Sequence, residues 1–163
     1  MKEIFPKIYI GTEQSCTFYP TTEWAIIHAC KYPCHAKALN YKSSLPKTHP
    51  YYLIAERDRN LFLNMVDMEK EFSPIFTNPI MKSALAFIEK HIVERKILIH
   101  CNQGLSRSPS IALLYLACKG YLANDSYSNA VADFRKLYPV FNPGLGIALY
   151  MKNNWSEIIN LIK

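Results

Sequence analysis

Cys101 and Arg107 are the residues of this chain whose types and spacing most clearly allow chemistry. They belong to the stretch His-Cys-Asn-Gln-Gly-Leu-Ser-Arg-Ser, which runs from residue 100 to residue 108. A cysteine thiolate is a strong nucleophile, and the planar fork of an arginine can hold two oxygens of a phosphate group. One nucleophile and one fixed cation around a short loop are suited to nucleophilic attack on a phosphate ester.

Two predicted elements position this loop. Lys96–His100 contains an unbroken apolar run, which is typical of a strand buried on both faces of a parallel sheet. The apolar segment after Pro109 predicts a buried helix over residues 108–119, with proline in its first turn. Cys101 is therefore expected at a strand-to-helix turn. There the backbone N–H groups and the positive end of the helix favour a bound phosphate and the thiolate form of the cysteine.

The loop residues have separate expected roles. Gly104 permits a backbone conformation that a side chain would resist, and Ser106 and Ser108 can donate hydrogen bonds to sulfur or phosphate. We expect His100 to orient the loop through hydrogen bonds rather than to transfer protons. The side chains of residues 102 and 103 are expected to be solvated, so that their backbone N–H groups matter more. The expected phosphate-binding residues are Asn102, Gln103, Gly104, Leu105, Ser106 and Arg107.

The stretch from His100 to Ser108 resembles the signature of the cysteine-dependent protein tyrosine phosphatase superfamily. Ser106–Pro109 is most similar to its compact dual-specificity branch. In Asn142–Gly146, which also resembles a part of that branch, the order of the residues departs from the family's usual pattern. The resemblance is weakest between about residues 30 and 58. Other segments that resemble parts of that branch are Phe5–Gly11, Leu114–Leu116 and Phe134–Pro139.

A phosphatase of this kind also needs a proton donor, because expulsion of an unprotonated alkoxide or phenoxide is unfavourable. Asp67 is the best candidate, since it ends a strand-like run and precedes Cys101 by 34 residues, a spacing similar to that of the family's loop-borne acid. Asp58 is the alternative, but its neighbours are charged, and solvated ion pairing is the usual fate of such a residue. Glu69 and Glu71 follow closely and stay open as assistants.

The resemblance implies two displacements at phosphorus. In the first, the Cys101 thiolate attacks while Arg107 holds the equatorial oxygens and Asp67 protonates the leaving oxygen, so that a cysteinyl-phosphate forms. In the second, water hydrolyses this intermediate with ionised Asp67 as general base, and Ser108 stabilises the departing sulfur. The mechanism implied by the resemblance requires no metal and no cofactor.

Length and composition predict one catalytic domain over residues 1–163, because this length suits a single core and half of the residues are apolar. No stretch reaches the ~18 consecutive apolar residues of a membrane span. The N-terminus lacks the charged and then apolar pattern of a signal peptide. We therefore expect an intracellular, cytoplasmic protein.

Five cysteines, an odd number without regular spacing, fit a reducing compartment better than a disulfide framework. His28, Cys30, Cys34 and His35 are residue types that bind zinc and lie close in sequence. Residues at such a strand end more often pack in the core, which is the favoured interpretation. In some relatives a cysteine near this strand end forms a disulfide with the nucleophile, so Cys30 is also a candidate redox partner of Cys101.

Alternating strands and helices predict an α/β fold, with a central, largely parallel, mixed sheet of about four to five strands and helices on both faces. Residues 31–58 are the least legible part, because Tyr51–Ala55 fits either a hairpin with the following strand or a helical turn. The predicted strands cover residues 7–10, 24–29, 60–66 and 96–100. A short helix or turn is predicted near residues 12–17. The predicted helices run from near Pro79 to about Glu94 and near residues 108–119, 124–137 and 144–161.

The expected substrate is a phosphoprotein. The loop carries no lysine, which disfavours an inositol lipid with several phosphates, whereas the formal charge of +6 would attract phosphoproteins, nucleic acid or an anionic membrane alike. A related branch removes 5′ phosphates from RNA and commonly lacks the acid, so Asp67 favours protein monoesters over this alternative. A catalytically silent module that binds phosphorylated partners is the alternative from another class.

Overall fold

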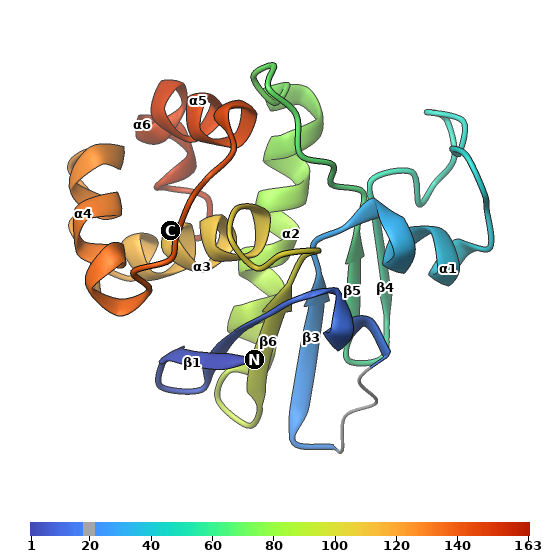
Figure 1. Ribbon diagram of the computed structural model, residues 1–163, viewed down its shortest axis with the longest axis horizontal. Coiled ribbons are helices and arrows are strands. Elements are labelled where there is room, and N and C mark those ends of the chain that lie inside the picture. The colour runs from blue at the N-terminus through green and yellow to red at the C-terminus, as the bar shows by residue number, and fades with distance from the viewer. Residues whose placement is uncertain (18–21) are drawn as a thin grey trace.

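A computed structural model describes residues 1–17 and 22–163. Within these residues six strands form one mixed sheet in the spatial order β1-β2-β6-β3-β5-β4 (Figure 1). The four inner strands are parallel, and β1 and β4 pair antiparallel at the two edges. The predicted α/β class and mixed sheet are confirmed, with more strands than expected. The strands are β1 Lys2–Phe5, β2 Ile8–Gly11, β3 Trp24–His28, β4 Ile54–Arg57, β5 Asn60–Leu63 and β6 Lys96–His100.

The two edge strands account for the difference in strand count. β1 was not predicted, because only Ile4 of its four residues is buried and no alternating pattern marks it. β4 pairs with β5 from Ile54 opposite Leu63 to Arg57 opposite Asn60, which confirms the hairpin rather than the helical turn. The predicted strand over residues 60–66 ends at Leu63, so that the following residues form the loop that carries Asp67.

The carboxyl ends of three parallel strands meet at one level. His100, the last residue of β6, pairs with Gly11 at the end of β2 and with His28 at the end of β3. Ligands of open α/β sheets bind outside such strand ends. Cys101 leaves the sheet at this edge, as the sequence predicted.

Helices cover both faces of the sheet, but unequally. Ile97 and Ile99 of β6 pack into the main core with residues of α2 and α3, and α4 packs against α3 (Figure 1). His100 points to the other face, which bears the short helical turns η1 and η2. The helices are η1 Glu13–Thr17, η2 Lys31–His35, α1 Ala36–Leu39, α2 Pro74–His91, α3 Arg107–Cys118, α4 Tyr127–Leu137, α5 Leu145–Asn153 and α6 Trp155–Ile158.

Two predicted helix boundaries are wrong. α2 begins at Pro74 rather than near Pro79, because a proline in the first turn lacks only an N–H that would have no partner there. Pro79 lies inside the helix, where it leaves the carbonyl of Ile75 without its helical N–H donor, but Ile75 is 79% exposed and water can take that place. The predicted helix over residues 144–161 is broken at Asn154, where φ is −114° and ψ is 13°.

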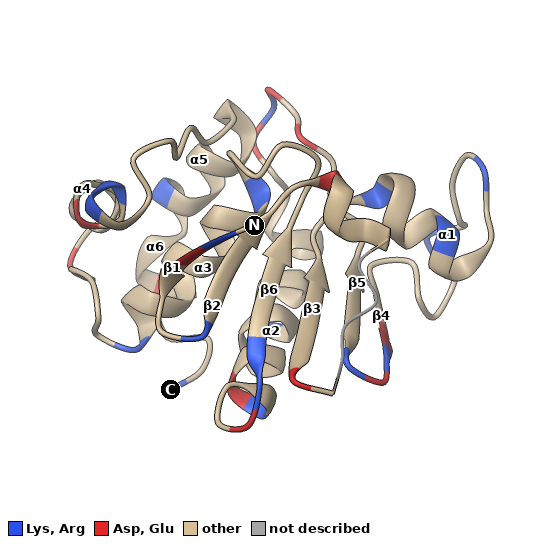
Figure 2. Ribbon diagram, turned by 60° about the horizontal axis from the view of Figure 1, so that its bottom comes forward, with Lys and Arg blue, Asp and Glu red and all other residues tan. Residues whose placement is uncertain are grey.

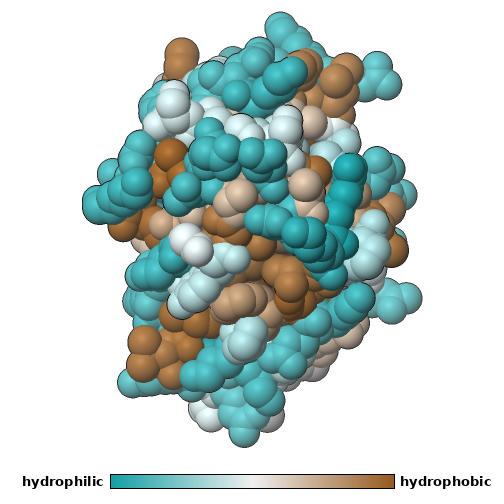
Figure 3. All heavy atoms as spheres, turned by 90° about the vertical axis from the view of Figure 1, so that its left-hand side faces the viewer, coloured by the Kyte–Doolittle hydropathy of each residue, from teal (hydrophilic) through white to brown (hydrophobic). Residues whose placement is uncertain are grey.

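Charge and apolar surface are spread over the molecule. Lys, Arg, Asp and Glu lie on the outer helices and at the ends of strands, with both signs interspersed (Figure 2). On the face that bears α4, hydrophobic residues form separate areas among hydrophilic ones (Figure 3). Among the described residues, no helix combines the length and the apolar character needed to cross a membrane.

Candidate active site

The loop between β6 and α3 turns several carbonyl oxygens outward. The N–H and the C=O of one peptide plane point in opposite directions, so the N–H groups of residues 103, 105 and 106 face the inside of the loop. Inward-facing N–H groups form a concave site for an oxyanion. The outward carbonyls of residues 102, 104 and 105 accept hydrogen bonds from, respectively, the N–H of Glu13 (3.0 Å), the hydroxyl of Tyr138 (2.9 Å) and the N–H of Asn142 (2.9 Å).

Gly104 has a backbone conformation that a residue with a side chain would resist, as the sequence analysis expected. Its φ is +71°, and a Cβ at this position would lie 2.9 Å from the carbonyl oxygen of Gly11. A larger residue would therefore be strained and would push the loop away from the end of β2.

Cys101 lies at the base of this loop. Its side chain is 1% exposed, and the hydroxyl of Ser108 donates a hydrogen bond to Sγ at 3.1 Å. Ser108 belongs to the first turn of α3, which begins at Arg107. The hydroxyl donor and the positive end of the helix both stabilise negative charge on the sulfur.

The guanidinium of Arg107 is held by four groups. Nε donates to Oδ2 of Asp67 at 3.1 Å, and Nη2 donates to Oδ1 of Asn102 at 2.7 Å. Nη1 donates to the carbonyls of Met65 at 3.0 Å and Ala29 at 3.4 Å. The residue is 6% exposed, so its position beside the loop is fixed before any ligand binds.

Asp67 reaches the same loop from a separate segment. Its Oδ1 accepts a hydrogen bond from the hydroxyl of Ser106 at 3.0 Å, while Oδ2 pairs with Arg107. The Ser106 hydroxyl in turn accepts from the N–H of Gly144 at 2.9 Å. The Asp67 side chain is 43% exposed, so an incoming molecule can contact it.

No protein-family model matches the chain, and no curated protein matches it in sequence. Solved structures do match its fold. The crystal structure of DUSP15 aligns with a TM-score of 0.65 and 17% identity, over 99% of this chain and 91% of that chain. A leucine rich repeat and phosphatase domain containing protein from Entamoeba histolytica aligns with a TM-score of 0.64 and 18% identity, over 99% and 94%. The chain has the dual-specificity phosphatase fold.

A third structure of this fold is the human tyrosine phosphatase-like serine/threonine/tyrosine-interacting protein. It aligns with a TM-score of 0.60 and 20% identity, over 97% of this chain and 91% of that chain. Sequence identities this low support only the shared dual-specificity phosphatase fold. The roles of individual residues must be argued from the site itself.

Among the described residues, the other candidate acids form no hydrogen bond with the loop. Asp58 has φ +54° in the turn that precedes β5, whereas Asp67 follows the opposite end of that strand. Glu71 accepts a hydrogen bond from Asn153 at 3.1 Å. Glu69 is exposed and lines a cleft together with Asp67. Of the acids proposed from the sequence, Asp67 is the one whose carboxylate accepts hydrogen bonds from Ser106 and Arg107.

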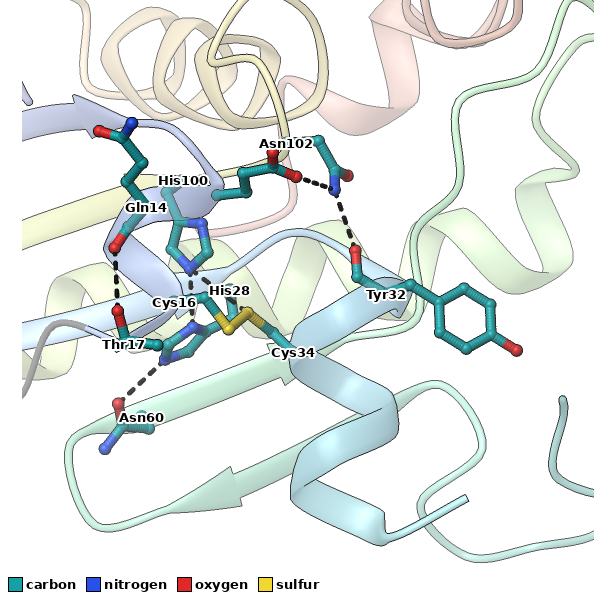
Figure 4. The surroundings of a disulfide bond; sticks show 10 residues. Gln14, Cys16, Thr17, His28, Tyr32, Cys34, Asn60, His100 and Asn102 are labelled. Carbon is teal, nitrogen blue, oxygen red and sulfur yellow. Dashed lines mark hydrogen bonds between the residues drawn. A yellow bond between two sulfur atoms is a disulfide. The ribbon is translucent and has the colours of Figure 1, made fainter. Parts of the chain in front are cut away.

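The His100 side chain faces away from the loop between β6 and α3. Its Nε2 lies 2.7 Å from Nδ1 of His28 and 3.8 Å from Sγ of Cys34 (Figure 4). Burial lowers the pKa of His28 to about 4 and the pKa of His100 to about 3, so both imidazoles are neutral near pH 7. The expectation that His100 orients the loop through its hydrogen bonds stays a prediction.

The cysteines divide into a bonded pair and free thiols. A disulfide joins Cys16 in η1 to Cys34 in η2, a pair that the odd cysteine count and irregular spacing did not reveal. Cys30, Cys101 and Cys118 are free. Burial raises the pKa of the Cys30 thiol to about 11. A disulfide between Cys30 and Cys101 stays a prediction.

Sequence reasoning included Asn102 for its backbone N–H but missed the role of its side chain. The expectation that it is solvated is wrong, because its Nδ2 donates to the carbonyl of Tyr32 at 3.0 Å and to Oε2 of Glu13 at 3.2 Å, while its Oδ1 holds Arg107. Gln103 is exposed, as expected. No signal in the sequence distinguishes the two amides, since their difference comes from tertiary contacts.

Gly146→Ala is expected to displace the Asp67 loop. The Gly146 N–H donates to the carbonyl of Met68 at 2.9 Å, and an added Cβ would overlap the carbonyl oxygens of Met68 and Lys70. We expect a loss of about 1–3 kcal/mol in the free energy of unfolding, typical of overpacking, and a roughly tenfold or larger fall in kcat. Denaturant titration and steady-state kinetics measure the two effects.

Gly120→Ala is the matched control, because Gly120 has φ +74° but nothing within 4 Å of an added Cβ. It should lower stability by about 1–2 kcal/mol through backbone strain alone and leave kcat unchanged. Equal kcat values for the two variants would contradict a positioning role for the contact between Gly146 and the Asp67 loop.

Proposed function

We propose that this protein is a cysteine-dependent phosphatase that hydrolyses phosphomonoesters of proteins through a cysteinyl-phosphate. The supporting observation is the convergence of three groups on one loop: the buried sulfur of Cys101 with its hydroxyl donor, the fixed guanidinium of Arg107, and the carboxylate of Asp67. Nucleophile, electrostatic stabiliser and acid are the parts that a phosphoryl transfer without metal needs.

In the proposed first displacement, the phosphate oxygens accept hydrogen bonds from the inward N–H groups and from Arg107. The phosphate competes with Asp67 for Nε of Arg107, which frees the carboxyl group for the leaving oxygen. The Cys101 thiolate attacks phosphorus, so that an S–P bond forms while the ester P–O bond breaks. Asp67 in its acid form gives its proton to the leaving oxygen.

In the proposed second displacement, a water molecule attacks phosphorus and gives a proton to ionised Asp67. The S–P bond breaks, and its electron pair returns to the sulfur of Cys101. Ser108 donates a hydrogen bond to that sulfur, at 3.1 Å in the free enzyme, which makes the thiolate a better leaving group. Inorganic phosphate leaves, and the enzyme returns to its starting state.

A cleft beside Asp67 supports a protein substrate. Residues on both sides of Asp67, among them Val66 and Met68, line a cleft of about 240 Å³. Phe72 and Phe76 make it mainly apolar. Apolar pockets next to a polar site accept apolar side chains, so a peptide with an aliphatic residue near its phosphorylated residue fits better than RNA.

A silent phosphate-binding module is the second candidate function. One human protein of this fold is named a tyrosine phosphatase-like serine/threonine/tyrosine-interacting protein, that is, for an interaction. The presence of Cys101, Arg107 and Asp67 together favours the enzyme.

Hydrolysis of para-nitrophenyl phosphate, with inhibition by vanadate, tests the proposed activity. A panel of phosphotyrosine, phosphoserine and phosphothreonine peptides, 5′-triphosphorylated RNA and inositol phosphates then tests the substrate class. We expect the peptides to be the best substrates, above all those with an aliphatic neighbour. No turnover on any compound would overturn the enzyme, and faster turnover of RNA would overturn the protein substrate.

Arg107→Lys is expected to lower kcat/KM by about 10²–10³-fold, because an ammonium cannot replace the fork that reaches phosphate oxygens from a fixed position. It also leaves Oδ1 of Asn102 and the carbonyl of Met65 without their donors. Kinetics on an aryl phosphate measure the loss, and Arg135→Lys on the exposed side of α4 is the control. Similar rates for both variants would argue against the proposed role of Arg107.

A further inference from the structure

A second cluster of reactive side chains lies near the phosphate loop, on the face of the sheet that bears η1 and η2 and is turned away from the main core. Cys16 comes from η1, His28 from the end of β3, Cys34 from η2 and His100 from the end of β6. Figure 4 shows these four side chains directed toward one another. The proposed phosphatase reaction uses none of their side chains.

The ligand atoms of this cluster are close together. Sγ of Cys16, Sγ of Cys34 and a ring nitrogen of His28 all lie within 4.8 Å of one another. Nε2 of His100 is 3.8 Å from Sγ of Cys34 and 2.7 Å from Nδ1 of His28. Cys30 lies nearby, since its Sγ is within 4.8 Å of Cys34 and His100.

These spacings are near those of a tetrahedral zinc site. With Zn–S near 2.3 Å and Zn–N near 2.0–2.1 Å, neighbouring ligand atoms are about 3.3–3.8 Å apart. The contact between Cys34 and His100 already has this length. To admit a metal, the two imidazole nitrogens, now 2.7 Å apart, must separate by about 0.6 Å. The sulfurs of Cys16 and Cys34, which are bonded to each other here, must also separate.

The protein also orients a ligand nitrogen in the cluster. Nε2 of His28 is 3.0 Å from Oδ1 of Asn60. Since a carbonyl oxygen only accepts, Nε2 carries the proton and Nδ1 keeps its lone pair. Metal-binding histidines typically donate their second ring N–H to such an acceptor. His28, Cys34 and His100 are buried, and only Cys16 is partly exposed, which suits a closed structural site.

We propose that the reduced protein binds one Zn²⁺ ion through Cys16, Cys34, His28 and His100. Two sulfurs and two imidazoles are a common ligand set of structural zinc. His35, the other histidine of the sequence-based zinc set, does not belong to it, because its ring contacts the hydroxyl of Tyr41 at 2.7 Å and the carbonyl of Tyr51 at 3.0 Å.

The disulfide and the zinc ion are alternative states of the same two sulfurs. A dithiol reductant breaks the bond between Cys16 and Cys34, becomes a cyclic disulfide, and leaves two cysteine thiols. Zn²⁺ then binds with release of both thiol protons. The Nε2 proton that His100 donates to Nδ1 of His28 moves to Nδ1 of His100, so that Nε2 can bind the metal. In either state η1 is joined to η2, and zinc in addition ties both turns to the ends of β3 and β6.

Zinc binding to the full chain tests this proposal. The protein is reduced with dithiothreitol, freed of reductant without oxygen, incubated with Zn²⁺ and desalted before its metal content is measured. We expect about one equivalent of zinc per chain. In the Co²⁺-loaded protein we expect the d–d absorption of a tetrahedral site and a sulfur-to-cobalt charge-transfer band.

Cys16→Ser and His28→Gln should each lower the zinc content at least tenfold and remove or weaken the cobalt bands. Cys118→Ser is the matched control, since that thiol lies near the carbonyl of Ile158, away from the cluster, and it should bind zinc like the parent protein. Zinc should also protect Cys16 and Cys34, but not Cys118, from alkylation. Less than a tenth of an equivalent in the reduced parent protein would overturn the proposal, as would equal zinc contents in Cys16→Ser and Cys118→Ser.

Discussion

Cys101→Ser is expected to lower phosphatase turnover by about 10⁴-fold or more, the order of loss seen when a covalent nucleophile is removed. A serine hydroxyl at this position is almost wholly protonated and is a far weaker nucleophile than a thiolate. The phosphate site itself should persist, because Arg107 and the inward N–H groups do not depend on the sulfur. Initial rates on para-nitrophenyl phosphate and calorimetric titration with inorganic phosphate measure the two quantities.

Cys118→Ser is the control for the loss of a thiol. Cys118 ends α3, is only partly buried and lies 3.7 Å from the carbonyl of Ile158. We expect this variant to keep the turnover of the parent protein. Undiminished activity in Cys101→Ser would refute the proposed mechanism, whereas loss of both turnover and phosphate binding would show that the sulfur also supports the loop.

The position of the loop between β6 and α3 was predictable because its determinants are local. The apolar run before His100 and the apolar helix after Pro109 place Cys101 at a strand end. The spacing of the loop residues then predicts a short loop between Cys101 and Arg107. The same holds for the carboxyl ends of β2, β3 and β6, since parallel strands place their ends at one edge. Asp67 was proposed as the acid from its position after a strand and its spacing from Cys101. The structure brings its carboxylate into contact with Ser106 and Arg107, and its role as the acid stays a prediction.

Other features depend on contacts between distant segments. The Asn102 side chain holds Arg107 only because Tyr32 and Glu13 lie beside it. The pairing of Cys16 with Cys34 requires η1 and η2 to meet over the sheet. No local sequence pattern predicts this contact. Residues 31–53 have few regular elements, and their arrangement is set by tertiary hydrogen bonds such as that of His35 with Tyr51. Sequence periodicity carries no information about such contacts.

Asp67→Ala is expected to slow the first displacement by about 10²–10⁴-fold, the usual contribution of a general acid. The effect should grow as the leaving group becomes more basic, because a good leaving group departs without a proton. A series of aryl phosphates should therefore show a steeper dependence of kcat/KM on leaving-group pKa in the variant than in the parent protein. Phosphate binding should be retained, since Arg107 keeps its contacts with Met65 and Asn102.

Glu69→Gln is the matched control, because Glu69 lies on the same loop, is exposed and lines the same cleft as Asp67. It should leave both the rate and the leaving-group dependence unchanged. If Asp67→Ala slows all substrates by the same factor, Asp67 acts by holding Arg107 and Ser106 in place rather than by donating a proton. If Glu69→Gln instead shows the steeper dependence, the acid is Glu69. Asp67 would then act by positioning the loop through its hydrogen bonds with Ser106 and Arg107.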